Sequence, residues 1–175
     1  MRAAGWIARV AVFSALVYTV SWATGFLPNI TLGFFIVFSA GYLWGAAAGV
    51  VTGAIGFGLW SAFNPYGPAP LPVMAAQAFG GAMVGLIGEV SSHLNLDSRS
   101  GGWRVVLLAL TGAVATAVFY LPVVLVDAWL FQPFEARLIA GFGWSIWPVA
   151  ANAVIFPLLF GATAALYARE RKQRA

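Results

Sequence analysis

The chain is a succession of apolar segments, each close to the length that crosses a lipid bilayer. A membrane-spanning helix needs about 20 mostly apolar residues, with a range of roughly 17 to 25. The segments lack the sustained alternation of apolar and polar residues that a membrane β-barrel requires. We therefore expect an all-α polytopic membrane protein with six transmembrane helices, near residues 5–24, 31–44, 46–63, 71–90, 103–127 and 141–168.

Charge is scarce. Charged residues make up 8% of the chain, whereas an ordinary soluble domain carries about 25%. Because so little charge cannot cover a water-facing surface, we expect one compact membrane domain over residues 1–175.

The second and third segments meet at "LWGAAAG". A single helix over 31–63 would be about 50 Å long, far more than the bilayer core, so a tight turn at Trp44-Gly45 is expected.

The basic residues predict the orientation. With six spans, eight of the nine lysines and arginines lie on the side of both termini, and Arg137 alone lies on the other. The positive-inside rule makes the side with the termini cytoplasmic. The net charge of +4 reflects this bias and not a nucleic-acid site, and the tail "RERKQR" is expected to meet anionic lipid or solvent.

Several kinds of chemistry are excluded or disfavoured. There are no cysteines, which excludes disulfides, thiolate nucleophiles and cysteine metal sites. The one histidine, His93, has no clustered ligand motif around it and is expected to be a solvated loop residue. The phosphate-loop pattern G-x-x-x-x-G-K-[ST] is absent, so any ATP hydrolysis must reside in another subunit.

Stripes of small residues occur at helical spacing. In lipid, small residues allow helix backbones to approach closely, so each stripe predicts a helix–helix contact. For the glycine stripes we favour packing inside the bundle. For the alanine stripe, internal packing and docking of a partner protein stay open. The stripes are Ala4, Ala8, Ala11 and Ala15; Gly45, Gly49, Gly53 and Gly56; and Gly81, Gly85 and Gly88.

Polar and aromatic residues gather toward the expected outer surface, where they could converge on a pocket. Neutral amides between aromatic walls suit a small, flat, partly apolar ligand. The proline-rich stretch "FNPYGPAPLP" would form a pre-organised wall that presents Asn64 and Tyr66. The alternative is an interfacial aromatic belt, with Asp127 marking a membrane boundary and Glu135 and Arg137 forming a surface ion pair. The candidate ligand-binding residues are Asn29, Asn64, Tyr66, Gln77, Asp127, Trp144, Trp147 and Asn152.

The layout resembles the substrate-binding S components of energy-coupling-factor (ECF) transporters. Six short helices, the alanine stripe and the stretch "PNITLGFFIVFSAGYLWGAAAGVVTGAIGFGLWSAFNPYGP" carry the resemblance. It implies a vitamin-capturing protein of a prokaryotic cell membrane. It also implies docking through the alanine stripe onto a transmembrane coupling protein with two cytoplasmic ATPases, which use the ATP, and a lid at residues 25–31. The chain itself would be no enzyme and would hold no cofactor or metal.

Three other functions remain as alternatives. A structural subunit of a rod-shape or cell-envelope complex would have similar size and span count but no ligand. A membrane enzyme would have to use Asp127, Glu135 and His93, and the expected topology places His93 on the opposite side from the other two. A channel is disfavoured, because the second segment is short and polar lining is sparse.

Overall fold

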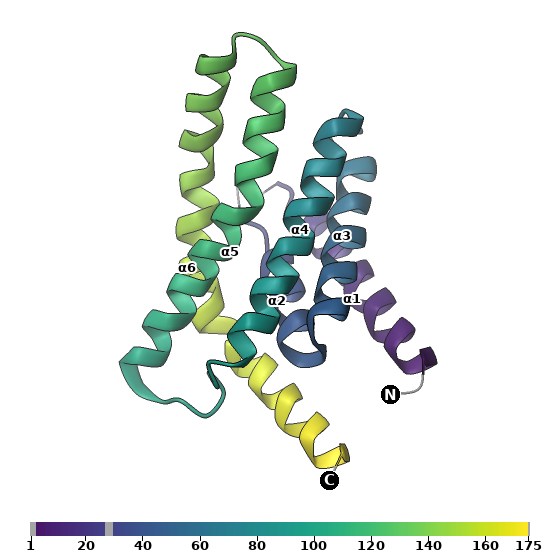
Figure 1. The fold of residues 1–175 in the computed structure, drawn as a ribbon, viewed down its shortest axis with the longest axis vertical. Helices are drawn as coiled ribbons and strands as arrows, with labels where there is room; N and C mark the ends of the chain where they lie inside the picture. Colours follow the sequence, from purple (N-terminus) through teal and green to yellow (C-terminus); the bar gives the residue numbers. More distant parts are fainter. Residues whose placement is uncertain (1–2, 27–29, 175) are drawn as a thin grey trace.

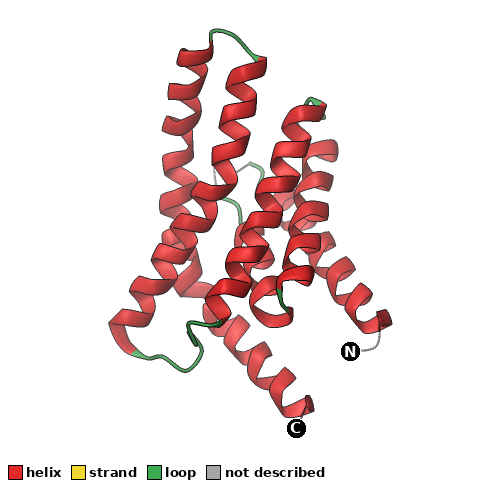
Figure 2. Cartoon of the chain, viewed as in Figure 1, coloured by secondary structure: helices red, strands yellow, loops and turns green. Residues whose placement is uncertain are grey.

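The computed structural model describes residues 3–26 and 30–174, and within them every regular element is a helix (Figures 1 and 2). This confirms the all-α fold class. The six helices are α1 (Ala3–Ala23), α2 (Gly33–Trp44), α3 (Ala46–Phe63), α4 (Leu71–Ser92), α5 (Gly101–Leu130) and α6 (Phe134–Arg174).

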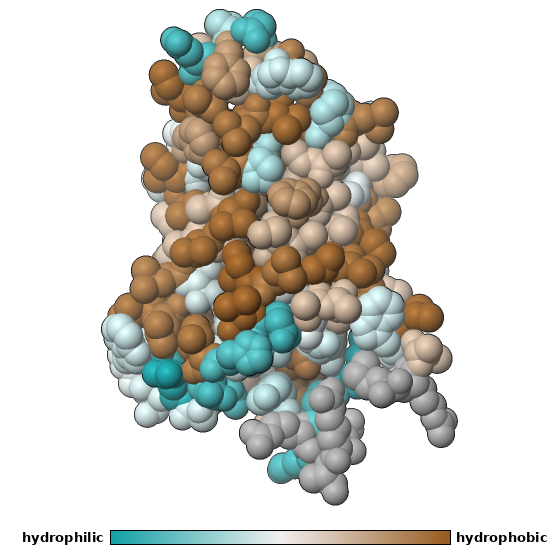
Figure 3. Space-filling view, viewed as in Figure 1, coloured by the Kyte–Doolittle hydropathy of each residue, from teal (hydrophilic) through white to brown (hydrophobic). Residues whose placement is uncertain are grey.

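Five of the six helices are long and apolar enough to cross a membrane, and α2 is a shorter apolar helix. Their length and composition indicate a multi-pass membrane protein. Figure 3 agrees with this, because hydrophobic residues form a broad band across the visible face, with hydrophilic residues gathered at its two ends. We call the end where α5 joins α6 the hairpin end, and the end where α1 begins and α6 finishes the terminal end (Figure 1).

The break between α2 and α3 lies at Gly45, as the sequence predicts. Gly45 has φ +91°, a left-handed conformation that glycine adopts without steric cost. Its N–H donates to the carbonyl of Gly41 at 2.9 Å, which closes the last turn of α2. The chain then reverses directly into α3, so the two segments are separate helices.

The connection between α5 and α6 is much shorter than the sequence prediction. The expected spans 103–127 and 141–168 leave residues 128–140 as an outer loop, but α5 continues to Leu130 and α6 already begins at Phe134. The side chain of Gln132 accepts a hydrogen bond from the N–H of Phe134 at 2.9 Å, which caps the start of α6. At 1.5 Å per residue α6 is roughly 60 Å long, so the expected loop is instead a helical hairpin that projects beyond α3 and α4 (Figure 1).

The shortest helix forms the centre of the bundle. Ten of the twelve residues of α2 are buried, and its aromatic side chains contact α3, α5 and α6. The ring centroids of Phe34 and Phe119 lie 4.9 Å apart, as do those of Phe38 and Phe156. A helix that is apolar all round belongs in the interior, which explains why α2 carries no polar face.

The middle parts of the glycine stripes of α3 and α4 face each other. A methyl group added at Gly53 would overlap the carbonyl oxygen of Gly81. One added at Gly49 would lie 2.7 Å from the carbonyl oxygen of Gly85. The two backbones touch without side chains between them, so α3 and α4 pack as one unit.

The last glycine of each stripe packs on a different helix. Gly56 packs on Val17 of α1, and Gly88 packs on Phe38 of α2. Together these contacts confirm the predicted internal packing of the glycine stripes.

The alanine stripe of α1 has the opposite environment. Ala4, Ala8, Ala11 and Ala15 are all exposed. α1 instead buries Val10, Ser14, Val17 and Ser21, and it packs on α2 and α3. The smooth alanine face therefore points away from the bundle.

A candidate ligand-binding cavity at the hairpin end

A cavity of about 330 Å³ lies at the hairpin end, between α4, α5 and α6. We call it the middle cavity. Its walls are mostly aliphatic and aromatic, with a few polar groups, which is the usual composition of a small-molecule site. Its lining residues are Val73, Gln77, Tyr120, Val123, Val124, Asp127, Arg137, Gly141 and Trp144.

Two further cavities adjoin the middle one. An inner cavity of about 80 Å³ shares Gln77, Tyr120 and Val123 with it and reaches Thr31 and Trp60. An outer cavity of about 450 Å³ shares Asp127, Arg137 and Trp144 with it. The three spaces therefore follow one another from the α5–α6 loop toward the aromatic core.

An ion pair stands where the outer and middle cavities meet. The guanidinium group of Arg137 lies 3.1 Å from the Asp127 carboxylate, and their side chains are 46% and 35% exposed. The Arg137 guanidinium also lies 4.8 Å from the centroid of the Phe131 ring. The sequence analysis considered a pair between Arg137 and Glu135 as part of its alternative, whereas Arg137 pairs with Asp127 in the structure. The helical hairpin explains the difference, because it brings the last turn of α5 beside the first turns of α6.

The inner part of the cavity presents an unpaired acceptor. The Gln77 Oε1 atom is buried and has no hydrogen-bond partner among the described residues. Leaving such an acceptor unsatisfied costs about 1–3 kcal/mol. A ligand that donates an N–H or O–H here would recover that free energy, which makes Gln77 the most informative polar group of the cavity.

Three of the eight predicted ligand-binding residues meet in this cavity, namely Gln77, Asp127 and Trp144. Asn29 lies outside the described residues. Trp147 is 66% exposed. It does not line the middle, inner or outer cavity.

Asn64 and Tyr66 also lie apart from the three cavities. The Asn64 side-chain amide donates to the carbonyl of Gly67 at 2.8 Å, within its own loop. The Tyr66 hydroxyl donates to the carbonyl of Gly25 at 2.6 Å, and the indole of Trp22 donates to the carbonyl of Phe63 at 3.0 Å. The proline-rich loop therefore fastens the end of α1 to the end of α3.

Asn152 is fully buried in α6. Its amide donates to the carbonyl of Pro148 at 2.9 Å. A methyl group at Gly112 would overlap the Asn152 backbone carbonyl, so α5 and α6 approach closely at this level. The Asn152 backbone thus contacts α5, whereas its side chain bonds within α6 and its buried Oδ1 has no partner among the described residues. Asn152 does not line the three cavities.

The sequence reasoning missed Tyr120 and Trp60, named Thr31 only as the last residue of the lid that the resemblance implies and as the first of the second span, and noted Arg137 without choosing it. Tyr120 was detectable, because a phenol inside the apolar run "AVFYLPVV" needs a partner. Arg137 was detectable as the one basic residue assigned to the side opposite the termini. Thr31 and Trp60 gave no signal of their own, since only the packing of α2 and α3 brings them to the cavity.

Comparison of the chain with protein-family models, with curated proteins and with solved structures returned no match.

Proposed function

We propose that this protein is the substrate-capture S component of an ECF-type importer in a prokaryotic cell membrane, and that it binds a vitamin-like molecule. The observation that carries the proposal is the meeting of Gln77, Asp127 and Trp144 around one cavity at the hairpin end. These residues come from three helices and were chosen from the sequence as ligand contacts. The cavity is lined by residues at the hairpin end, and α1 begins at the opposite end of the bundle (Figure 1), so the cavity lies where a protein that loads from outside would need it.

The proposed orientation has six spans, with both termini in the cytoplasm. α2 would act as the sixth membrane segment although it is short, because it is buried at the centre of the bundle. The basic residues of the terminal end support this orientation through the positive-inside rule. The cavity would then open to the outside of the cell.

The exposed alanine face of α1 supports the second half of the proposal, which is docking onto a coupling protein with two ATPases. The glycine stripes of α3 and α4 already pack inside the bundle. By contrast, the alanine stripe stays exposed at Ala4, Ala8, Ala11 and Ala15. Small residues on a lipid-facing helix permit close helix–helix contact. We assign this face to the coupling protein.

The cavity chemistry limits the ligand. Its middle part offers an amide acceptor, a phenol and an indole, and its mouth offers one acid and one base. A small molecule with a flat ring, one hydrogen-bond donor for Gln77 and a charged or polar group at the mouth would fit these groups.

Native mass spectrometry of the protein, purified from cells grown in rich medium, tests the proposal. We expect one small molecule per chain, released on denaturation and identified by its mass. Replacing Gln77 by Leu should remove that molecule, whereas Trp147→Phe, outside the three cavities, should retain it. A protein that stays empty, and that no member of a vitamin panel stabilises against heat, would refute ligand capture and favour a structural subunit.

A further inference from the structure

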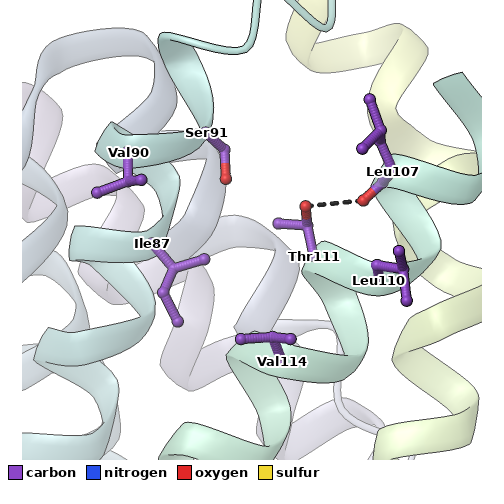
Figure 4. Close-up of a pocket in the computed structure, with 7 residues that line it drawn as sticks. All are labelled: Ile87, Val90, Ser91, Leu107, Leu110, Thr111 and Val114. Atoms are coloured by element: carbon purple, nitrogen blue, oxygen red, sulfur yellow. Dashed lines mark hydrogen bonds between the residues drawn. The ribbon is translucent and has the colours of Figure 1, made fainter.

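A second, almost wholly apolar groove of about 300 Å³ lies between α4 and α5, toward the terminal end. Figure 4 shows Ile87 and Ser91 of α4 pointing toward Thr111 and Val114 of α5 across it. The lining residues are Ile87, Val90, Ser91, Leu107, Leu110, Thr111 and Val114. None of them lines the middle cavity, so the two sites are distinct.

The groove exists because α4 and α5 touch closely at one level and separate below it. A methyl group at Gly80 would lie 2.8 Å from the carbonyl oxygen of Phe119, which marks the close approach. At the terminal end, residues 93–100 join the two helices. Val90 is 65% exposed, Leu110 56% and Val114 52%, so the groove faces the surroundings of the protein.

The groove offers few free polar groups to bind water or a polar ligand. The Thr111 hydroxyl already donates to the carbonyl of Leu107 at 2.8 Å, as Figure 4 shows. In the hydrocarbon layer an apolar groove of this kind loses van der Waals contacts unless an apolar group fills it. A lipid acyl chain has the right chemistry.

Positive charge lies at the terminal end of the groove. Arg99 precedes α5 and Arg104 lies in its first turns, one helical turn before the groove residue Leu107. Arg104 donates to the carbonyl of Arg99 at 3.4 Å and lies 5.2 Å from the Phe160 ring centroid, and the Arg99 Nε donates to the carbonyl of Leu94 at 2.8 Å. These contacts leave other guanidinium N–H groups of both residues for a phosphate.

The α5 N-terminus adds partial positive charge, and Ser100 makes no side-chain cap there. The nearby acids point elsewhere: Asp97 accepts the Tyr42 hydroxyl at 2.8 Å, and the Glu89 carboxylate lies 3.4 Å from His93.

We propose that this groove binds one acyl chain of an anionic phospholipid, whose phosphate lies against Arg99 and Arg104. The positive charge of the two arginines favours an anionic headgroup. The apolar walls of the groove favour a lipid acyl chain, which a free phosphate ion lacks. The site depends on the membrane character of the fold and not on the transport function proposed above.

The test adds phosphatidylglycerol or phosphatidylcholine to delipidated, detergent-purified protein, and it measures lipid adducts by native mass spectrometry and the shift in melting temperature. We expect one tightly held phosphatidylglycerol, bound about tenfold more tightly than phosphatidylcholine. The double variant Arg99→Gln/Arg104→Gln should lose this preference. Inorganic phosphate alone should not stabilise the protein.

Groove-filling variants complete the test. Leu110→Trp, on the exposed rim, and Thr111→Trp, inside, should each reduce phosphatidylglycerol binding about tenfold or more. Val105→Trp is the matched control. Val105 is 52% exposed, and at 3.6 residues per turn it lies on the opposite face of α5 from Leu107 and Val114, so the variant should bind like the parent protein. Equal affinity for the two lipids, or undiminished binding in Leu110→Trp, would overturn the proposal.

Discussion

Arg9 on α1 and Glu170 on α6 form an ion pair with an N–O distance of 2.7 Å, although 161 residues separate them. The indole of Trp44 donates to the same carboxylate at 3.4 Å, and the Arg9 guanidinium lies 5.3 Å from the Trp44 ring centroid. One acid thus joins α1, α2 and α6 at the terminal end. The two charged side chains are only 28% and 18% exposed, so solvent screens the pair partly.

A double-mutant cycle on this pair should reveal a favourable coupling. We expect Arg9→Gln and Glu170→Gln each to lower the free energy of unfolding, with a coupling energy of about 1 kcal/mol, the upper end for partly exposed pairs. Equilibrium unfolding in mixed detergent measures it. The coupling should shrink at high salt, and a value of zero at low salt would mean that the ion pair contributes nothing to stability.

The glycine contact between α3 and α4 should tolerate no added methyl group. Gly53→Ala should destabilise the fold by about 1–3 kcal/mol, because the methyl would push the α4 backbone away. Gly58→Ala is the control on the same helix, since a methyl there meets no atom within 4 Å, and it should be neutral or stabilising. Equal melting temperatures for the two variants would show that α3 and α4 do not pack as described.

The alanine face of α1 should matter for assembly and not for the fold. Ala8→Trp and Ala11→Trp should keep the melting temperature and ligand retention of the parent protein while abolishing co-purification with the coupling protein and ATPases of its own genome. Leu16→Trp, also exposed on α1 but outside the stripe, should assemble normally. Loss of the fold in the Ala8 and Ala11 variants would instead assign the stripe to internal packing.

Gln77 and Asn152 should separate binding from stability. Asn152→Ala removes the hydrogen bond to Pro148 and leaves a void at a fully buried position. We expect these losses to exceed the gain from removing its unpaired Oδ1, with a net loss of stability of about 1 kcal/mol and unchanged ligand affinity. Gln77→Leu removes an unpaired acceptor, so the fold should keep its stability while affinity falls tenfold or more. Melting temperature and ligand titration, run on both variants, distinguish the two roles. Weakened binding in Asn152→Ala at full stability would return Asn152 to the ligand site.

Much of the helical layout was predictable, because apolar length and glycine placement act locally. The turn at Gly45 and the α3–α4 contact were predictable because glycines at those positions permit a tight turn and a close approach of two backbones. The α5–α6 hairpin was not predictable in this way. Charged residues near 127–137 suggested a solvated loop, whereas a helix extended beyond the bilayer core exposes the same charges equally well.

The candidate site was predictable only in part, for a related reason. Gln77 and Trp144 stand out as polar and aromatic residues near helix ends, but their meeting depends on how α4, α5 and α6 pack. Asn64 and Tyr66 are likewise an amide and an aromatic residue near a helix end. Their side chains, however, bond within the proline-rich loop and to Gly25, just after α1. Residue type identifies candidates, and only tertiary packing tells a ligand contact from a structural one.

The size of α2 also bears on how the protein enters the membrane. Twelve residues make a helix about 18 Å long, much shorter than the roughly 30 Å hydrocarbon core. Such a segment gives the insertion machinery a weak signal by itself. α2 should therefore insert together with α3 as a helical hairpin, joined by the Gly45 turn. A reporter fused directly after Trp44 removes α3, so it would report the position of α2 without its partner helix and not the mature topology. A reporter fused after Phe63 keeps both helices and should report on which side of the membrane the α3–α4 loop lies.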